Sequence, residues 1–122
     1  MVQAKVKSDY TNGMLRFRVT GEIDHHSALG VREVIDEEAQ RHDPRVVVID
    51  LGGIEFMDSS GLGLILGRYT RLRDRGIPLK IENPTKQIER ILGMAGVDKL
   101  IPIVRTEKTE KKERKKKEVK LQ

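Results

Sequence analysis

Apolar and polar residues alternate in two successive segments near the start of the chain. Residues 3–10 alternate weakly, and residues 14–20 alternate cleanly, with apolar residues on one side and arginines on the other. Between them, Thr11-Asn12-Gly13 is a hairpin signal, because Asn and Gly tolerate the positive φ angles of tight turns. We therefore predict two antiparallel strands, the second with one polar face toward water.

From residue 27 onward, apolar residues recur at intervals of three and four, which predicts amphipathic helices. We expect helices over 27–42, over 60–75, and from Asn83-Pro84 to about 95. Asn83 is the expected N-cap of the third helix, with Pro84 in its first turn, and Gly96 fits a left-handed end. The apolar stripe of the first helix is predicted to contain Ala28, Val31, Val34, Ile35 and Ala39.

Short apolar runs between these helices predict further strands. A buried strand is expected over 45–51, followed by a loop over 52–58, and shorter strands over 77–82 and 100–104. Pro102 lacks a ladder donor, which favours an edge position for the last strand. Because strands and helices alternate, the later strands should be parallel. The expected fold class is α/β, with a mixed sheet that starts with an antiparallel pair and is flanked by helices.

Charge is distributed unevenly along the 122 residues, a length that fits one domain. Residues 105–122 hold nine Lys or Arg against four Glu, and residues 1–104 carry 15 basic and 15 acidic residues. We predict a folded domain over 1–104 and a charged, net basic tail over 105–122 that is disordered or a frayed helix. The neutral domain shows no basic face with interleaved aromatic residues, so direct DNA binding is not expected.

The chain contains no cysteine, which is compatible with a reducing compartment. It also lacks an apolar stretch as long as a signal peptide or a membrane span. We therefore expect a soluble cytoplasmic protein that does not act at a membrane.

The segment Phe56-Met57-Asp58-Ser59-Ser60-Gly61-Leu62-Gly63 lies where the chain passes from the buried strand to the second helix. One of the two serines is expected to cap the helix. A phosphate on a serine there would lie at the positive end of the helix dipole, with Asp58 acting against it. Capping alone does not explain an apolar Leu62 and small glycines beside the serines. We interpret the segment as a docking surface with a phosphorylatable hydroxyl at its centre, where small residues let a partner's backbone approach.

Enzymatic alternatives find little support. Neither serine has glycine two residues away on both sides, as a hydrolase nucleophile elbow requires, and no Gly-Lys-Ser or Gly-Lys-Thr phosphate loop occurs. Gly61-Leu62-Gly63 is a weak dinucleotide signal, because the next glycine, Gly67, comes one position late. His25 and His26 should diverge on regular structure, so a metal site is not expected. We predict neither an enzyme nor a cofactor.

The sequences GEIDHHSA (Gly21–Ala28) and FMDSSGLGLILGRY (Phe56–Tyr69) closely resemble the anti-anti-sigma factors of the STAS domain family. The resemblance covers about residues 2–104 and implies a STAS fold and a partner-switching function. In this scheme the unphosphorylated protein binds an anti-sigma factor that is also a serine kinase, and thereby releases the sigma factor. The kinase holds ATP and magnesium in its own site and phosphorylates the first serine of Asp-Ser-Ser-Gly, which is Ser59; a serine phosphatase resets the switch.

The resemblance also implies that Asp24 lies near Ser59 and contacts the kinase, whereas the tail from Arg105 matches nothing in the family's usual closing helix. The histidine pair and the LGRY segment favour a member that controls sporulation. A STAS module of another pathway, such as the general stress response or a sensor scaffold, is the first alternative. A small nucleotide- or ligand-binding domain using the Gly61–Gly63 turn is the alternative from another class. The predicted partner-binding residues are Asp24, Asp58, Ser59, Ser60, Gly61, Leu62 and Gly63.

Overall fold

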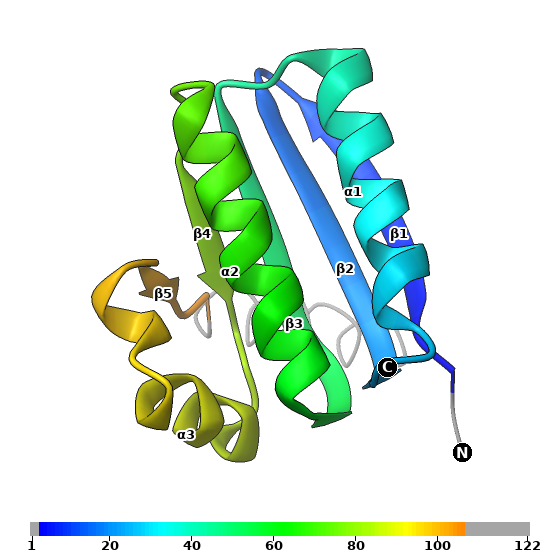
Figure 1. Ribbon diagram of the computed structural model, residues 1–122. Helices are drawn as coiled ribbons and strands as arrows, with labels where there is room; N and C mark the ends of the chain where they lie inside the picture. The colour runs from blue at the N-terminus through cyan, green and yellow to red at the C-terminus, as the bar shows by residue number, and fades with distance from the viewer. Residues whose placement is uncertain (1–2, 107–122) are drawn as a thin grey trace, which may run out of the picture.

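The computed structural model describes residues 3–106, which form one sheet with helices packed against it (Figure 1). In chain order the elements are β1 (Lys5–Thr11), β2 (Met14–Ile23), α1 (Ala28–His42), β3 (Val46–Met57), α2 (Ser59–Asp74), β4 (Leu79–Glu82), α3 (Lys86–Met94), the short 3-10 helix η1 (Val97–Lys99) and β5 (Ile103–Val104).

The sheet is mixed, as predicted. Its strand order is β1-β2-β3-β4-β5, with β1 and β2 antiparallel and every later neighbouring pair parallel. Asn12 and Gly13 have φ angles of 53° and 82°, which confirms the predicted hairpin turn. The last strand, β5, lies at the edge, as expected from Pro102.

The core lies between the sheet and the helices α1 and α2, which run side by side over one face (Figure 1). In α1, Val31, Ile35 and Ala39 are buried as predicted, but Val34 is 36% exposed. Val34 faces a cavity beside β1, so the buried stripe is narrower than the sequence pattern. The largest fully buried side chains include Leu15, Phe17, Ile23, Ile35, Leu51, Ile54, Ile65, Ile81, Ile88 and Leu92.

Two strands are longer than the sequence indicated. β2 continues to Ile23 and β3 to Met57, so the loop predicted over 52–58 is wrong. The glycines at 52 and 53 looked like a strand end, but a Cβ on Gly53 would lie 2.6 Å from Thr20 Cγ2. This glycine lets two strands approach closely and does not end one of them.

The third helix begins later than predicted. Its N-cap is Thr85, whose hydroxyl accepts a hydrogen bond from the Ile88 amide at 3.2 Å, so the assignment of Asn83 as the cap is wrong. Asn83 instead has a φ of 52°, and its side-chain oxygen accepts from the Thr106 amide at 2.8 Å. Gly96 has a φ of 77°, which confirms the left-handed end.

Two arginines on the polar side of β2 form ion pairs with carboxylates of β3 and β4. Arg16 donates to both carboxylate oxygens of Glu82, at 3.0 and 2.9 Å, and Arg18 contacts Asp50 at 3.3 Å. The two carboxylates are buried, and the Glu82 carboxylate raises the pKa of Arg16 above its ordinary value. The side of β2 that was predicted to face water therefore carries arginines that are paired with carboxylates.

The predicted tail lies mostly outside the described residues, because 107–122 are not among them. Its first two residues are bonded to the folded body: Arg105 donates to Glu89 and to the Pro84 carbonyl, and Thr106 bonds to Asn83. The domain boundary at residue 104 and the order of the tail stay predictions.

Candidate functional site

The candidate site forms where two parallel strands end side by side. Ile23 and Met57 are register partners on β2 and β3, and the Asp58 amide donates to the Ile23 carbonyl at 3.2 Å. Asp24 and Asp58 directly follow these two strand ends. The fold therefore brings two of the predicted site residues, 34 positions apart in the sequence, to the same edge of the sheet.

Asp58, and neither serine, caps α2. Its Oδ1 accepts a hydrogen bond from the Ser60 amide at 2.8 Å, and the helix starts at Ser59. The expectation that a serine caps this helix is therefore wrong. A carboxylate is the better acceptor at this position, because its negative charge also interacts with the positive end of the helix dipole. The cap thus leaves the Ser59 hydroxyl unused, and Ser59 is exposed.

The amides of Ser60, Gly61 and Leu62, in the first turn of α2, are already engaged by Asp58. The Gly61 and Leu62 amides donate to its backbone carbonyl at 3.0 and 3.3 Å, in addition to the bond from Ser60. A phosphate on Ser59 would therefore share the helix end with a carboxylate that already occupies it. Like charges in close proximity repel, so the helix end offers less relief for a phosphate than a free N-terminus would.

The two glycines of the segment serve different purposes. A Cβ on Gly61 would lie 2.1 Å from Met57 Cγ, so Gly61 is buried where α2 packs on β3. The prediction had Gly61 on the surface that contacts a partner, but its position in the structure is not accessible to one. A Cβ on Gly63 would meet nothing within 4 Å. Leu62 is half-buried against the core. Since Gly61 to Gly63 lie inside a helix, they form no loop that could wrap a phosphate, which weakens the nucleotide-binding alternative.

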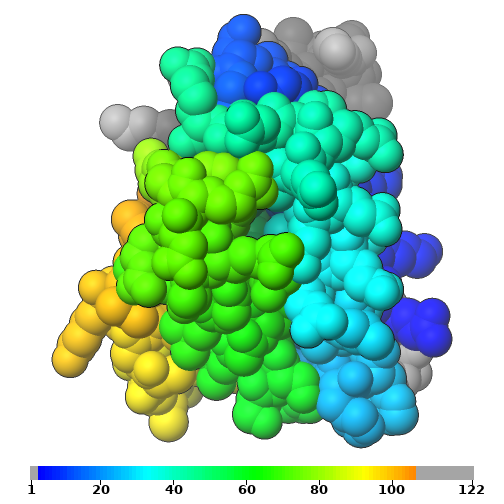
Figure 2. Space-filling view, turned by 45° about the horizontal axis from the view of Figure 1, so that its top comes forward, coloured from blue at the N-terminus to red at the C-terminus, as the bar shows by residue number. Residues whose placement is uncertain are grey.

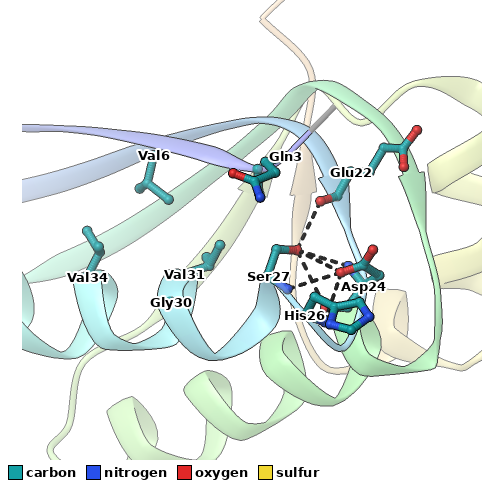
Figure 3. Close-up of a pocket in the computed structure, with 10 residues that line it drawn as sticks. Gln3, Val6, Glu22, Asp24, His26, Ser27, Gly30, Val31 and Val34 are labelled. Carbon is teal, nitrogen blue, oxygen red and sulfur yellow. Dashed lines mark hydrogen bonds between the residues drawn. The ribbon is translucent and has the colours of Figure 1, made fainter. Parts of the chain in front are cut away.

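Asp24 builds the turn that leads into α1 (Figure 3). Its Oδ1 accepts from the His26 and Ser27 amides at 2.9 and 3.0 Å, while the Ser27 hydroxyl donates to the Glu22 carbonyl at 3.0 Å. The hydrogen bond from the Ser27 amide is the main reason why the pKa of Asp24 is lowered. The carboxylate is thus held in its ionised form, with these bonds concentrated on one of its two oxygens.

His25 and His26 do not diverge as predicted. Their ring centroids lie 3.9 Å apart, because the two residues occupy a turn where the alternation of a strand does not apply. Within residues 3–106, no group of three His, Cys, Asp or Glu side chains is arranged to hold a metal ion.

Two hollows flank the N-terminal half of α1. One, of about 510 Å³, lies between α1 and β1 and has an apolar floor that includes Val6, Val31 and Val34, with Asp24 at its rim (Figure 3). The other, of about 320 Å³, lies between α1 and α2 and contains Arg68 in its wall. The sequence analysis did not identify Arg68. Its position among the apolar residues of the second helix was the available signal, since a charge there requires a partner, which is Asp36 of α1.

Residues 5–110 match the model of the STAS domain. The chain belongs to the STAS domain family. It is 37% identical over 103 residues to the anti-sigma F factor antagonist of Paenibacillus polymyxa, an alignment covering 84% of this chain and 88% of that protein. It is 31% identical over 90 residues to the anti-sigma-B factor antagonist of Bacillus subtilis, covering 73% and 80% of the two chains.

The solved structure of the anti-sigma factor antagonist SpoIIAA in its unphosphorylated form has the same fold. Its TM-score is 0.72, with 23% sequence identity and coverage of 90% of this chain and 96% of that chain. None of the helices within residues 3–106 has both the length and the apolar character needed to cross a membrane.

Proposed function

We propose that this protein is an anti-sigma factor antagonist whose binding to its partner is controlled by a phosphate on Ser59. The observation that carries the proposal is the position of Ser59, exposed at the first residue of α2, with the capping role taken by Asp58. The names of its relatives, antagonists of the anti-sigma F and anti-sigma-B factors, support the antagonist part of this proposal. In the unphosphorylated state the protein binds an anti-sigma factor and so releases a sigma factor.

The partner in this proposal is also a serine kinase, which holds ATP and magnesium in its own site. The Ser59 hydroxyl oxygen forms a bond to the γ-phosphorus of ATP, the bond from that phosphorus to the β–γ bridging oxygen breaks, and ADP and the hydroxyl proton leave. A serine phosphatase hydrolyses the phosphate and restores the binding form. The protein itself supplies the acceptor and no catalytic group, and it acts in the cytoplasm, where the kinase meets ATP.

The phosphate acts through charge. It adds roughly −1.5 to −2 charges beside Asp58, whose carboxylate already engages the end of α2. Removing such a charge from water in an interface, without a partner, costs about 2–5 kcal/mol. About 5.5 kcal/mol converts a 99:1 population into 1:99, so a single phosphate comes close to emptying the complex.

The decisive experiment incubates the full chain with its cognate anti-sigma kinase, ATP and magnesium, followed by mass spectrometry of the peptides. We expect one phosphate, on Ser59, none on the Ser59→Ala variant, and undiminished phosphorylation of the matched control Ser60→Ala. A phosphate that persists on Ser59→Ala, or one that maps to Ser60, would contradict the proposal.

Binding separates the role of the charge from that of the hydroxyl. Titration calorimetry with the kinase should give wild-type affinity for Ser59→Ala and weaker binding for Ser59→Asp. If Ser59→Asp binds as tightly as Ser59→Ala, the charge mechanism is wrong.

We further propose that the pathway is the one that controls sporulation. One anti-sigma F factor antagonist is 37% identical to this chain, whereas two anti-sigma-B factor antagonists are 31% and 34% identical. The anti-sigma-B relatives make a general stress pathway the second candidate. Titrating the protein against the anti-sigma F and anti-sigma-B factors of its own organism distinguishes the two pathways, and tighter binding to the anti-sigma-B factor would reverse the assignment.

A further inference from the structure

The N-terminal halves of α1 and α2, two helices that lie side by side in Figure 2, line a groove of about 320 Å³. It starts at Ser60, in the first turn of α2, and extends along both helices to Arg68. The groove is therefore continuous with the surface that carries Ser59. Its lining residues are Ala28, Leu29 and Arg32 of α1 and Ser60, Gly63, Leu64, Gly67 and Arg68 of α2.

On the α2 side of this groove, two of the lining residues are glycines, which have no side chain to fill it. Ser59, Gly63 and Gly67 are spaced by four residues, which places them along one face of α2. A Cβ on Gly63 or Gly67 would meet nothing within 4 Å, so packing within residues 3–106 does not require a glycine at either position. Glycine is also less favourable than alanine inside a helix. The stripe thus lowers helix stability and leaves space for an atom from outside the described fold.

An arginine with an unused donor lies in the same groove. Arg68 is only 9% exposed, and its Nη1 donates to both carboxylate oxygens of Asp36. Its Nε is buried and has no hydrogen-bond acceptor anywhere in residues 3–106. A buried donor without an acceptor is unfavourable, so this guanidinium has the capacity to bind one more oxygen atom.

The remaining charge at the groove has the same sign. Arg32 lines it from α1 and is exposed, while Asp36, the ion-pair partner of Arg68, is already engaged by that arginine. Guanidinium groups bind carboxylates in a planar, two-bond geometry. Beside them Leu29, which is 53% exposed, offers an apolar contact. An acidic side chain next to a small apolar one complements these features.

We propose that the α1–α2 groove receives a segment of the anti-sigma factor that carries an Asp or Glu side chain, bound by Arg32 and Arg68. The proposal rests on the proposed function, because it names the chemistry of the same partner. The backbone of that segment approaches α2 over Gly63 and Gly67.

This arrangement also explains how a phosphate on Ser59 acts on the partner. Ser59 lies four residues before Gly63 on the same helix face, about 6 Å along the axis. The end of the groove nearest Ser59 therefore lies within the Debye length of about 8 Å at physiological ionic strength, whereas Arg68, nine residues from Ser59, lies about 14 Å along the axis. The phosphate therefore repels negative charge of the partner at that end of the groove, as well as opposing its own burial.

The test measures the affinity of the cognate anti-sigma factor for the full chain by titration calorimetry. Gly67→Leu fills the groove, and Arg32→Glu reverses its charge; a Cβ at Gly67 meets nothing within 4 Å, and Arg32 is exposed. We expect each variant to bind at least about tenfold more weakly than the wild type, an effect typical of a central interface contact. Gly93→Leu and Arg90→Glu introduce the same changes on α3, away from the groove, and should bind within about twofold of the wild type.

The outcomes separate the groove from the proposed function. If the wild type binds and Ser59→Asp weakens binding, but Gly67→Leu and Arg32→Glu bind like the α3 controls, the groove proposal is overturned and the function stands. If the wild type does not bind the anti-sigma factor at all, both proposals fail. The dependence of the affinity on salt tests whether the partner residue is acidic. Added salt should weaken binding of the wild type more than binding of Arg32→Glu. An equal salt dependence of the two affinities would overturn the proposal that the partner residue is Asp or Glu. Thermal melts confirm that each variant is folded.

Discussion

Gly61 offers the sharpest test of how α2 is seated on the sheet, since replacing it with alanine adds a single methyl group. That methyl carbon would lie 2.1 Å from Met57 Cγ, 2.8 Å from Met57 Sδ and 3.2 Å from Ile23 Cγ2. Carbon atoms in favourable contact are about 3.5–4.0 Å apart, so Met57 or the helix start must move. Both neighbours belong to strand ends that position Asp24 and Asp58, and the disturbance would reach the candidate site.

The size of the effect follows from two opposing contributions. Overpacking of a closely packed site costs about 1–3 kcal/mol, while replacing glycine by alanine in a helix gains about 1 kcal/mol. Gly61→Ala should therefore lose roughly 0–2 kcal/mol. Gly67→Ala, in the same helix but with open space around its Cβ, should only gain. The two variants are expected to differ in their free energy of unfolding by about 1–3 kcal/mol.

Urea unfolding of the wild type and both variants measures this difference, with equal m-values as the condition for comparing them. Gly63→Ala is the second control, because its Cβ also meets nothing within 4 Å. If Gly61→Ala is as stable as Gly67→Ala, the packing role assigned to Gly61 is refuted, and its function would have to lie at the surface after all.

Three further predictions concern the cap, the ion pairs and the effect of pH. Asp58→Ala should lower the free energy of unfolding by about 1 kcal/mol, whereas Asp58→Asn should keep most of the cap; equal losses in urea would argue against capping. Arg16→Met leaves the buried Glu82 carboxylate without its partner and should cost roughly 1–3 kcal/mol, more than Arg18→Met, whose arginine side chain is 64% exposed; the reverse order would contradict the pairing. Because the pKa of Asp24 is lowered, its ionised form stabilises the fold above the ordinary value of 3.8, and this contribution disappears as the pH falls through the lower, folded-state pKa. An NMR titration should place the Asp24 midpoint below 3.8, and the stability difference between wild type and Asp24→Ala should shrink in acid; a midpoint above 3.8 would contradict the turn geometry.

Local patterns were sufficient for the first two helices and for the class of fold. The period of three to four residues placed α1 and α2 within one residue of their observed ends, and the Asn12-Gly13 pair identified the hairpin. The strand ends were not predictable in this way. Gly53 interrupts the apolar pattern, yet it is there because Thr20 of the neighbouring strand packs against it. Such a contact depends on tertiary structure and leaves no local signal.

In the candidate site, too, the features with a local sequence signal were predicted and those that depend on tertiary contacts were not. The sequence located a hydroxyl at a strand-to-helix turn, and the structure keeps Ser59 exposed there. It did not distinguish Gly61 from Gly63, because one faces a strand and the other does not, and that depends on how the helix is rotated on the sheet. Arg68 was missed for a related reason: its partner, Asp36, comes from another helix 32 residues away in the sequence.

The identity of the capping residue determines what a phosphate on Ser59 can do to the protein. If Ser59 were the cap, its oxygen would hold a helix amide, and phosphorylation would alter the first turn of α2 itself. Asp58 is the cap, so in the proposed switch a phosphate on Ser59 replaces no hydrogen bond of the cap and no contact of Gly61 with Met57. The charge then changes the surface and leaves the fold as it is. A switch of this kind is reversible at every cycle, because removing the phosphate restores a binding surface whose supporting structure was never disturbed.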